Sequence, residues 1–147
     1  VLMGQGMLAI SGKGGLSPLN EAAAYGHSEA AAMLIKLGAD VNLEDEDGET
    51  AVMKASQKGH HCVMRVLISL GAEVDHRNVD GKTALMYASF GGHCSAIAVL
   101  LEERADVNAV DMVCGFRPIL MAASQGHSEA VAMLTAAGAD IEAKDEW

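Results

Sequence analysis

The sequence predicts an all-α fold, a solenoid of stacked helix-turn-helix units joined by extended turns, and three observations support this. Half of the 147 residues are hydrophobic but only 3% are aromatic, so the core must consist of small and aliphatic side chains, which suit helices. Sixteen glycines and two prolines indicate many short helices separated by turns. The third observation is an internal repeat, and a fixed period of about 20 to 50 residues is typical of stacked repeats.

Three sequence markers share one period. The dipeptide Gly-His occurs at 26–27, 59–60, 92–93 and 126–127, in steps of 33, 33 and 34 residues. A second series has the same steps and consists of Gly15, Gly48, Gly81 and Gly115. A third reads Gly-Ala-Asp-Val-Asn at 38–42, Gly-Ala-Glu-Val-Asp at 71–75, Arg-Ala-Asp-Val-Asn at 104–108 and Gly-Ala-Asp-Ile-Glu at 138–142. The markers divide residues 15–147 into the units 15–47, 48–80, 81–114 and 115–147.

Each unit is predicted to begin with a short helix, as at 51–57 and 84–90. Side-chain oxygens two residues after the first glycine can accept an N–H group of the first helical turn, and these residues are Ser17, Thr50 and Thr83. Pro18 and Pro118 follow the same position, where proline suits the first helical residue. The glycine of the Gly-His dipeptide is then expected to turn the chain.

A longer helix is predicted to follow, over 62–70 in the second unit, where apolar residues fall at helical spacing. Glycine stands just after this helix in three units, where a left-handed residue is expected, at Gly38, Gly71 and Gly138. The third unit has Arg104 there instead. A left-handed conformation at a non-glycine residue costs roughly 1–2 kcal/mol, so we expect this helix end to be strained or rebuilt. The next turn is one residue longer, near 112–114.

The two ends of the chain fit the repeat less well. Residues 1–14 are predicted to be a leader or a degenerate helix of a preceding repeat, and residues 145–147 look like the opening of a fifth unit. The chain opens on Val1, and no polar capping repeat is visible at either end, although a solenoid normally needs one. We therefore expect the parent protein to be longer.

Residues 15–147 resemble the ankyrin-repeat family, whose signature is T-P-L-H-x-A. The four units read Ser-Pro-Leu-Asn-Glu-Ala at 17–22, Thr-Ala-Val-Met-Lys-Ala at 50–55, Thr-Ala-Leu-Met-Tyr-Ala at 83–88 and Arg-Pro-Ile-Leu-Met-Ala at 117–122. The resemblance implies a scaffold that holds a segment of a partner protein on its concave face, formed by extended finger turns and the exposed sides of the short helices. The alternative is a recruitment module of a larger enzyme or channel.

Charge and composition argue against other classes of protein. The net charge is −10, and the ten Lys and Arg residues are scattered, so nucleic acid is not an expected partner. The apolar windows fall short of the roughly 18–20 residues that a membrane span requires. The three cysteines include no Cys-x-x-Cys motif and are expected to be reduced thiols of an intracellular protein, in the cytoplasm.

The residues that could bind a metal or catalyse a reaction do not form a site. His27, His60, His93 and His127 occupy equivalent positions on helices expected to lie about 8–10 Å apart, too far to share a zinc ion with bonds of about 2.0–2.1 Å. The glycines at 4–15 lack the spacing of a phosphate-binding loop, and the acidic run at 44–49 lacks that of an EF-hand. We therefore expect no metal, no cofactor and no enzymatic activity.

Mapping the concave face of the family onto this sequence predicts nine partner-binding residues, namely Tyr25, Glu46, Asp47, Glu49, Lys58, Lys82, Phe90, Met112 and Phe116. Two features there point to recognition. Five carboxylates between 44 and 49 would attract a basic segment, although a solvated turn is the alternative. The aromatic trio Tyr25, Phe90 and Phe116 would anchor an amphipathic segment, although padding between neighbouring units is the alternative.

The resemblance also marks Asn42 and Asn108. They match the finger asparagine that oxygen-sensing hydroxylases modify in some ankyrin proteins. The alternative is a turn asparagine whose side chain satisfies its own backbone.

Overall fold

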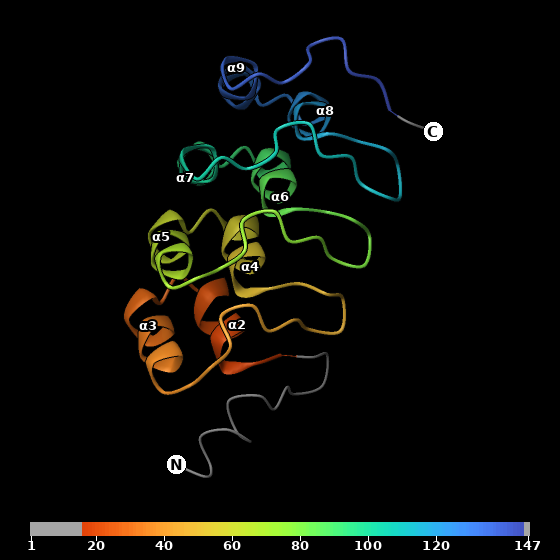
Figure 1. Ribbon diagram of the computed structural model, residues 1–147. Coiled ribbons are helices and arrows are strands. Elements are labelled where there is room, and N and C mark those ends of the chain that lie inside the picture. The colour runs from red at the N-terminus through yellow and green to blue at the C-terminus, as the bar shows by residue number, and fades with distance from the viewer. Residues whose placement is uncertain (1–15, 146–147) are drawn as a thin grey trace.

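The computed structural model describes residues 16–145 of the chain, so the prediction for residues 1–14 lies outside the described residues. The described part consists of four helix pairs, α2 (Pro18–Ala24) with α3 (Ser28–Lys36), α4 (Ala51–Lys58) with α5 (His61–Ser69), α6 (Ala84–Gly91) with α7 (Cys94–Glu102), and α8 (Pro118–Ser124) with α9 (Ser128–Ala136). The first helices form one column, the second helices form another, and the fingers extend from the first column away from the second (Figure 1). The prediction of an all-α solenoid is confirmed.

The first helices begin where their sequence predicts. The Ser17 hydroxyl accepts a hydrogen bond from the backbone N–H of Asn20 at 3.1 Å, and Thr83 caps α6 in the same way. The predicted side-chain cap at Thr50 is wrong, because Thr50 stands at the N-cap position of α4 but its hydroxyl makes no capping hydrogen bond. Pro18 and Pro118 are the first residues of α2 and α8. The second helix of the second repeat begins at His61, one residue earlier than predicted, because His60 takes the N-cap position.

The core lies between the two columns and is built from aliphatic and methionine side chains. Those buried almost completely include Leu19, Met53, Met64, Leu67, Leu85, Ile97, Leu100 and Leu134. Each first helix packs on the first helix of the next repeat, and each second helix packs on the next second helix. One repeat cannot enclose its own apolar face, so burial depends on stacking.

The Gly-His dipeptide joins neighbouring repeats. The imidazole of His93 lies over Gly59 of the preceding repeat, and a Cβ atom on that glycine would sit 2.7 Å from the ring nitrogen Nδ1. The other ring nitrogen, Nε2, is 3.0 Å from the backbone oxygen of Gln57. His127 repeats this arrangement against Gly92 and the backbone oxygen of Phe90. The glycine of each dipeptide therefore leaves space, which the histidine of the next repeat fills.

The histidines do not converge on a common point. Within residues 16–145, no three His, Cys, Asp or Glu side chains are grouped so that they could hold a metal ion. The absence of bound metal from the native protein stays a prediction. Across the same residues, no helix combines the length and apolar character that crossing a membrane requires.

The second helices end on residues with positive φ, including the predicted exception. The φ angles of Gly38, Gly71 and Gly138 are +111°, +105° and +100°, and that of Arg104 is +61°. Arg104 donates its N–H to the Leu101 carbonyl at 3.0 Å, as glycine does in the other repeats. The helix end is therefore not rebuilt, and Arg104 adopts the strained conformation that the sequence predicts.

The fingers are tight turns at 45–49, 78–82 and 111–116, here called the first, second and third fingers. Each is closed by the side chain of its first residue. In the first finger, the Asp45 carboxylate oxygen Oδ1 accepts from the backbone N–H groups of Asp47 and Glu49 at 3.0 and 2.9 Å. In the second finger, the Asn78 side-chain oxygen accepts the two equivalent N–H groups at 2.9 Å each.

The third finger contains the inserted residue. The Asp111 oxygen Oδ1 accepts from Cys114 and Phe116 at 3.0 and 3.1 Å, one residue further along than in the other fingers. The insertion is therefore absorbed between Asp111 and Cys114, where Met112 and Val113 are exposed. The turn is otherwise the same, so the longer connection is as regular as its neighbours.

Asn42 and Asn108 also join repeats. The Asn42 amide donates to the Gly71 carbonyl at 3.2 Å, and its oxygen accepts from the Glu73 N–H at 2.9 Å. Asn108 donates to the Gly138 carbonyl at 3.4 Å. The interpretation of an asparagine that satisfies its own backbone is therefore wrong, because each side chain bonds the next repeat. Hydroxylation of these residues stays a prediction.

Candidate functional site

Three positions of each repeat lie where the finger meets the first helix, and we call them the groove positions. They are the residue after the finger glycine, the variable fifth residue of the signature, and the residue three further along the helix. In the second, third and fourth repeats they are Glu49, Lys54 and Gln57; Lys82, Tyr87 and Phe90; and Phe116, Met121 and Ser124.

In the second repeat the groove positions form a closed polar network. Glu49 is buried, with 7% of its surface exposed. Its oxygen Oε1 accepts from Lys54 Nζ at 2.8 Å and from Gln57 Nε2 at 3.0 Å. Lys54 Nζ also lies 2.8 Å from the carboxylate of Asp45, which is itself buried. The network leaves little of these charges for a partner.

The network extends into the third repeat through the other carboxylate oxygen of Glu49. This oxygen accepts from the Tyr87 hydroxyl and, at 3.3 Å, from the Asn78 amide. Burial alone would raise the pKa of Glu49, but hydrogen bonds from Lys54, Tyr87 and Gln57 outweigh it, so the pKa is lowered. The pKa of Tyr87 is raised by burial and by its bond to Glu49. Glu49 is therefore held as a carboxylate that links two repeats.

These contacts correct one prediction. Glu49 was expected to be an exposed partner-binding residue, yet both of its oxygens bond within the protein. The side chain of Asp45 is 3% exposed. The exposed carboxylates of the predicted acidic run are therefore Glu44, Glu46 and Asp47, and Glu44 lies 2.6 Å from His76. Lys54 explains the difference, because its partly buried ammonium group lies 2.8 Å from the carboxylates of both Asp45 and Glu49.

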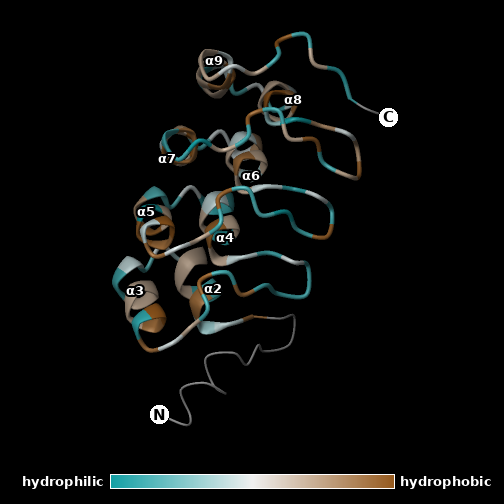
Figure 2. Cartoon of the chain, in the orientation of Figure 1, coloured by the Kyte–Doolittle hydropathy of each residue, from teal (hydrophilic) through white to brown (hydrophobic). Residues whose placement is uncertain are grey.

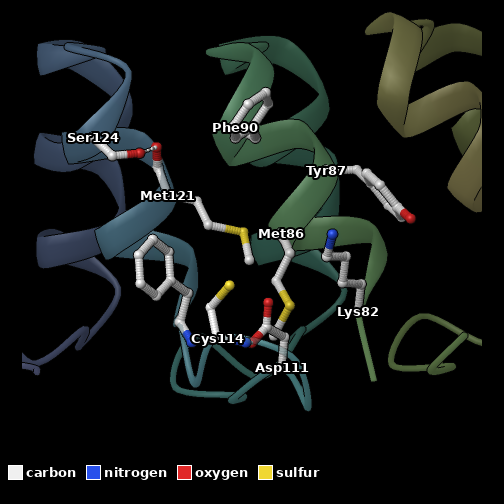
Figure 3. Close-up of a pocket in the computed structure, with 9 residues that line it drawn as sticks. Lys82, Met86, Tyr87, Phe90, Asp111, Cys114, Met121 and Ser124 are labelled. Atoms are coloured by element: carbon white, nitrogen blue, oxygen red, sulfur yellow. Dashed lines mark hydrogen bonds between the residues drawn. The ribbon is translucent and has the colours of Figure 1, made fainter. Parts of the chain in front are cut away.

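In the third and fourth repeats the groove positions surround a pocket. Its volume is about 280 Å³, and it lies between α6, α8 and the third finger. Figure 3 shows Phe90 on α6 and Met121 on α8 on opposite sides of it, with Cys114 on the finger beside them. All six groove positions of these repeats line it, together with three further residues, Met86, Asp111 and Cys114.

The pocket has a buried floor and an exposed rim. Phe116 packs against Met86 and Met121, which are 0% and 6% exposed. Phe90 is 54% exposed, and the thiol-bearing residue Cys114 is also exposed. The floor is therefore fixed by packing, while the rim is open to a ligand.

The structure brings some of the predicted residues together and separates others. Lys82, Phe90 and Phe116 meet at the pocket, and Met112 lies on the adjoining finger with 64% of its surface exposed. Tyr25 is 67% exposed but lies in the first repeat, where its ring stacks on His27. Of the predicted aromatic trio, Phe90 and Phe116 therefore lie together at the pocket, and Tyr25 lies apart from them. Lys58 is exposed at the end of α4.

Sequence reasoning missed Lys54, Tyr87 and Met121, although a signal for them existed. All three stand at the variable fifth position of the signature, which faces the finger rather than the core. It also missed Cys114 and Met86. Met86 replaces the histidine of the signature, and a repeat alignment alone does not show that it forms the floor of a pocket.

Neighbouring fingers are hydrogen-bonded at their tips. The N–H of Val79 donates to the Asp47 carbonyl at 3.0 Å, and the N–H of Met112 donates to the Asp80 carbonyl at 2.8 Å. Along this ladder the character changes from hydrophilic in the first finger to hydrophobic in the third (Figure 2). The face formed by the fingers is therefore acidic at the first finger and apolar at the third.

Comparison with known proteins agrees with this architecture. The family model for ankyrin repeats (three copies) matches residues 19–111 and, a second time, residues 80–145. These matches cover most of the chain, which therefore belongs to the ankyrin-repeat family. The chain is also similar to the ankyrin repeat-containing protein P1E11.10 of Schizosaccharomyces pombe (strain 972 / ATCC 24843), with 44% identity over 36 residues. That alignment spans 24% of this chain and 17% of the relative.

Proposed function

We propose that this protein is an interaction scaffold that binds a basic or amphipathic segment of a partner protein on its concave face. Membership of the ankyrin-repeat family supports protein binding in general. The observation that carries the finer proposal is the composition of the finger tips. Glu46, Asp47 and Asp80 are exposed on the first two fingers, beside the exposed apolar side chains of Val79 and Met112.

The fingers offer these groups in a fixed arrangement. Each finger is closed by its own first side chain, and the fingers bond to one another at their tips. A surface that is already ordered loses less conformational entropy on binding. Exposed carboxylates at such a rim speed the approach of a basic segment, while apolar contacts contribute most of the affinity.

An intracellular location is part of the proposal. It rests on Cys62, Cys94 and Cys114, which are all free cysteines. Disulfides form in secreted proteins, whereas thiols stay reduced inside most cells.

The test is a selection of short random peptides against the immobilised chain, followed by binding kinetics. We expect the selected peptides to be enriched in Lys and Arg beside an apolar residue. Reversing the charges in Glu46→Lys with Asp47→Lys should slow association at low salt by about tenfold and flatten its dependence on salt.

The matched control reverses two charges on the second-helix side, Glu29→Lys with Glu103→Lys, where both residues are exposed. This variant has the same net charge as the test variant, and we expect its association rates to stay close to those of the unmodified protein. Peptide association that responds equally to both variants, or to neither, would contradict the proposal.

A further inference from the structure

The pocket between the third and fourth repeats is a second feature of the concave face, distinct from the acidic finger tips. In the second repeat the side chains at the equivalent positions, Glu49, Lys54 and Gln57, are hydrogen-bonded to one another. In the fourth repeat Phe116 and Met121 make no such bonds and leave a cavity of about 280 Å³. The same backbone therefore carries a closed surface at one repeat and an open one at another.

We infer that this pocket receives one apolar anchor side chain, aromatic or long aliphatic, of the basic partner segment. The inference rests on the proposed function and names the residue type that the partner must supply. Its occupant is a polypeptide because the third finger, which lines the pocket with Asp111 and Cys114, is hydrogen-bonded through the Met112 N–H to the second finger, where Asp80 is exposed. A segment with separate basic and apolar parts complements a face that is acidic on one side and apolar on the other.

The size and lining of the pocket fit a side chain. Pockets for whole small molecules are commonly about 300–1,000 Å³ and bury most of the ligand. This pocket, at about 280 Å³, lies just below that range, and its rim residue Phe90 is half exposed. Met86 and Met121 line the pocket with polarizable thioether side chains, which make favourable contacts with aromatic groups. An aromatic ring that enters the pocket would also meet Phe90 and Phe116, which both line it.

Lys82 sets the spacing of the segment. It lines the pocket, so a Lys or Arg of the partner at the anchor position would meet a like charge. The basic part must therefore lie towards the first finger, at Glu46 and Asp47. With repeats stacked about 8–10 Å apart, that distance is roughly one and a half repeats, which an extended chain covers in about four residues.

Cys114 allows the pocket to be tested without a known partner. Its thiol lines the pocket and is exposed, whereas Cys62 is exposed on α5 away from the pocket. The folded chain is equilibrated under mild reductant with a benzyl disulfide and with a hydroxyethyl disulfide, and each cysteine is mapped by mass spectrometry. We expect the benzyl group to accumulate at Cys114 about tenfold over the hydroxyethyl group, and no such preference at Cys62.

A rim variant identifies the cause of this preference. Phe90→Ala removes one apolar wall, so the benzyl preference at Cys114 should fall by several fold. Leu37→Ala is the matched control, because Leu37 is an apolar residue at the end of α3 in the first repeat, is 63% exposed and lies outside the predicted binding set, and it should leave the preference unchanged. Equal benzyl capture at Cys114 and Cys62, or a preference that survives Phe90→Ala, would overturn the inference.

The selected peptides separate the inference from the proposed function. Replacing the anchor of such a peptide by Ala, or using the Phe90→Ala protein, should raise Kd by about tenfold, with no change for Leu37→Ala. If peptides respond to the Glu46 and Asp47 reversals but their Kd ignores Phe90→Ala, the proposed function stands and the pocket inference is wrong. If no peptide binds but benzyl capture at Cys114 is selective, the pocket takes apolar groups and the polypeptide occupant is wrong.

Discussion

The second repeat and the junction of the third and fourth repeats share one fold but differ at three places. The second repeat ends its second helix on Gly71, follows a finger of five residues, and closes its groove positions with the buried carboxylate of Glu49. At the later junction, Arg104 replaces the helix-ending glycine and the third finger gains a residue. Phe116 there occupies the position of Glu49 beside an open pocket.

The difference shows which positions stacking constrains. At every described interface, the histidine of one Gly-His turn fills the space that the glycine of the preceding turn leaves free. Both residues therefore recur in each repeat without change. The groove positions face away from the core, and either a salt bridge or an apolar cavity is compatible with the fold. Departures from the repeat are therefore tolerated on the concave face, and recognition can be encoded there.

The largest expected effect comes from removing the cation of the second repeat. Lys54→Met leaves the carboxylates of Asp45 and Glu49 buried without their shared partner, since both lie 2.8 Å from Lys54 Nζ. Breaking one side of a buried ion pair costs about 3–5 kcal/mol, and we expect a loss of that order in urea unfolding. Lys58→Met, on the exposed end of the same helix, is the control and should change stability little. Similar losses in the two variants would mean that the network does not stabilise the repeat.

A smaller effect, with a defined dependence on pH, is expected for Glu49→Gln. The folded state lowers the pKa of Glu49, so the carboxylate contributes stability above its unfolded pKa of roughly 4.3 and loses it as the pH falls through the folded value. The variant should lose about 2 kcal/mol near neutral pH, because hydrogen bonds to charged groups contribute about 1.5–3 kcal/mol.

The difference between the two proteins should then shrink as the pH falls from about 7 to about 3, because the wild-type carboxylate becomes protonated. Urea midpoints measured in parallel at several pH values give this difference directly, since other acidic residues titrate in both proteins. A difference that stays constant with pH would show that the charge of Glu49 contributes nothing to the stability of the second repeat.

Substitutions at the ends of the second helices are expected to change the free energy of unfolding by about 1 kcal/mol, upward in one case and downward in the other. Arg104→Gly relieves a φ angle of +61° and should raise stability by about 1 kcal/mol. Gly71→Ala should lower it by a similar amount, since a Cβ atom there would make only an ordinary contact, 3.9 Å from Val41, and the cost is that of the backbone alone. An Arg104→Gly midpoint in urea that falls, with unchanged slope, would instead reveal a stabilising contact of the arginine.

The repeat could be read from the sequence because its markers have separate physical causes at a fixed period. Gly59 and Gly92 adopt a positive φ and lie 33 residues apart, and Ser17 and Thr83 cap helices that are two repeats apart. The same reasoning also located Arg104 as a left-handed residue.

The site was harder to predict because its residues are defined by contacts between repeats. Glu49 looked like one acid among five, and nothing in its local sequence shows that Tyr87 of the next repeat bonds it. Phe90 and Phe116 were expected in one group with Tyr25, but the distance along the stack separates Tyr25 from them. The period of the sequence repeat shows on which face of the stack a residue lies. A pocket depends in addition on the shapes of the side chains where two particular repeats meet.

The smallest expected effect distinguishes recognition from padding at the apolar junction. Phe90 is 54% exposed at the rim of the pocket, so Phe90→Ala removes a ring that is only half buried. Alanine also favours the helix more than phenylalanine does, which offsets part of the lost burial. We expect a net change in unfolding free energy of about 0.5 kcal/mol or less, as for surface substitutions.

Phe116→Ala should cost several times more, because that ring packs against the buried Met86 and Met121. If Phe90 instead serves as padding between repeats, its removal should approach the roughly 3–5 kcal/mol of a core phenylalanine. Urea midpoints of the two variants decide between these outcomes, and a small loss at Phe90 means that the exposed ring is available to a partner.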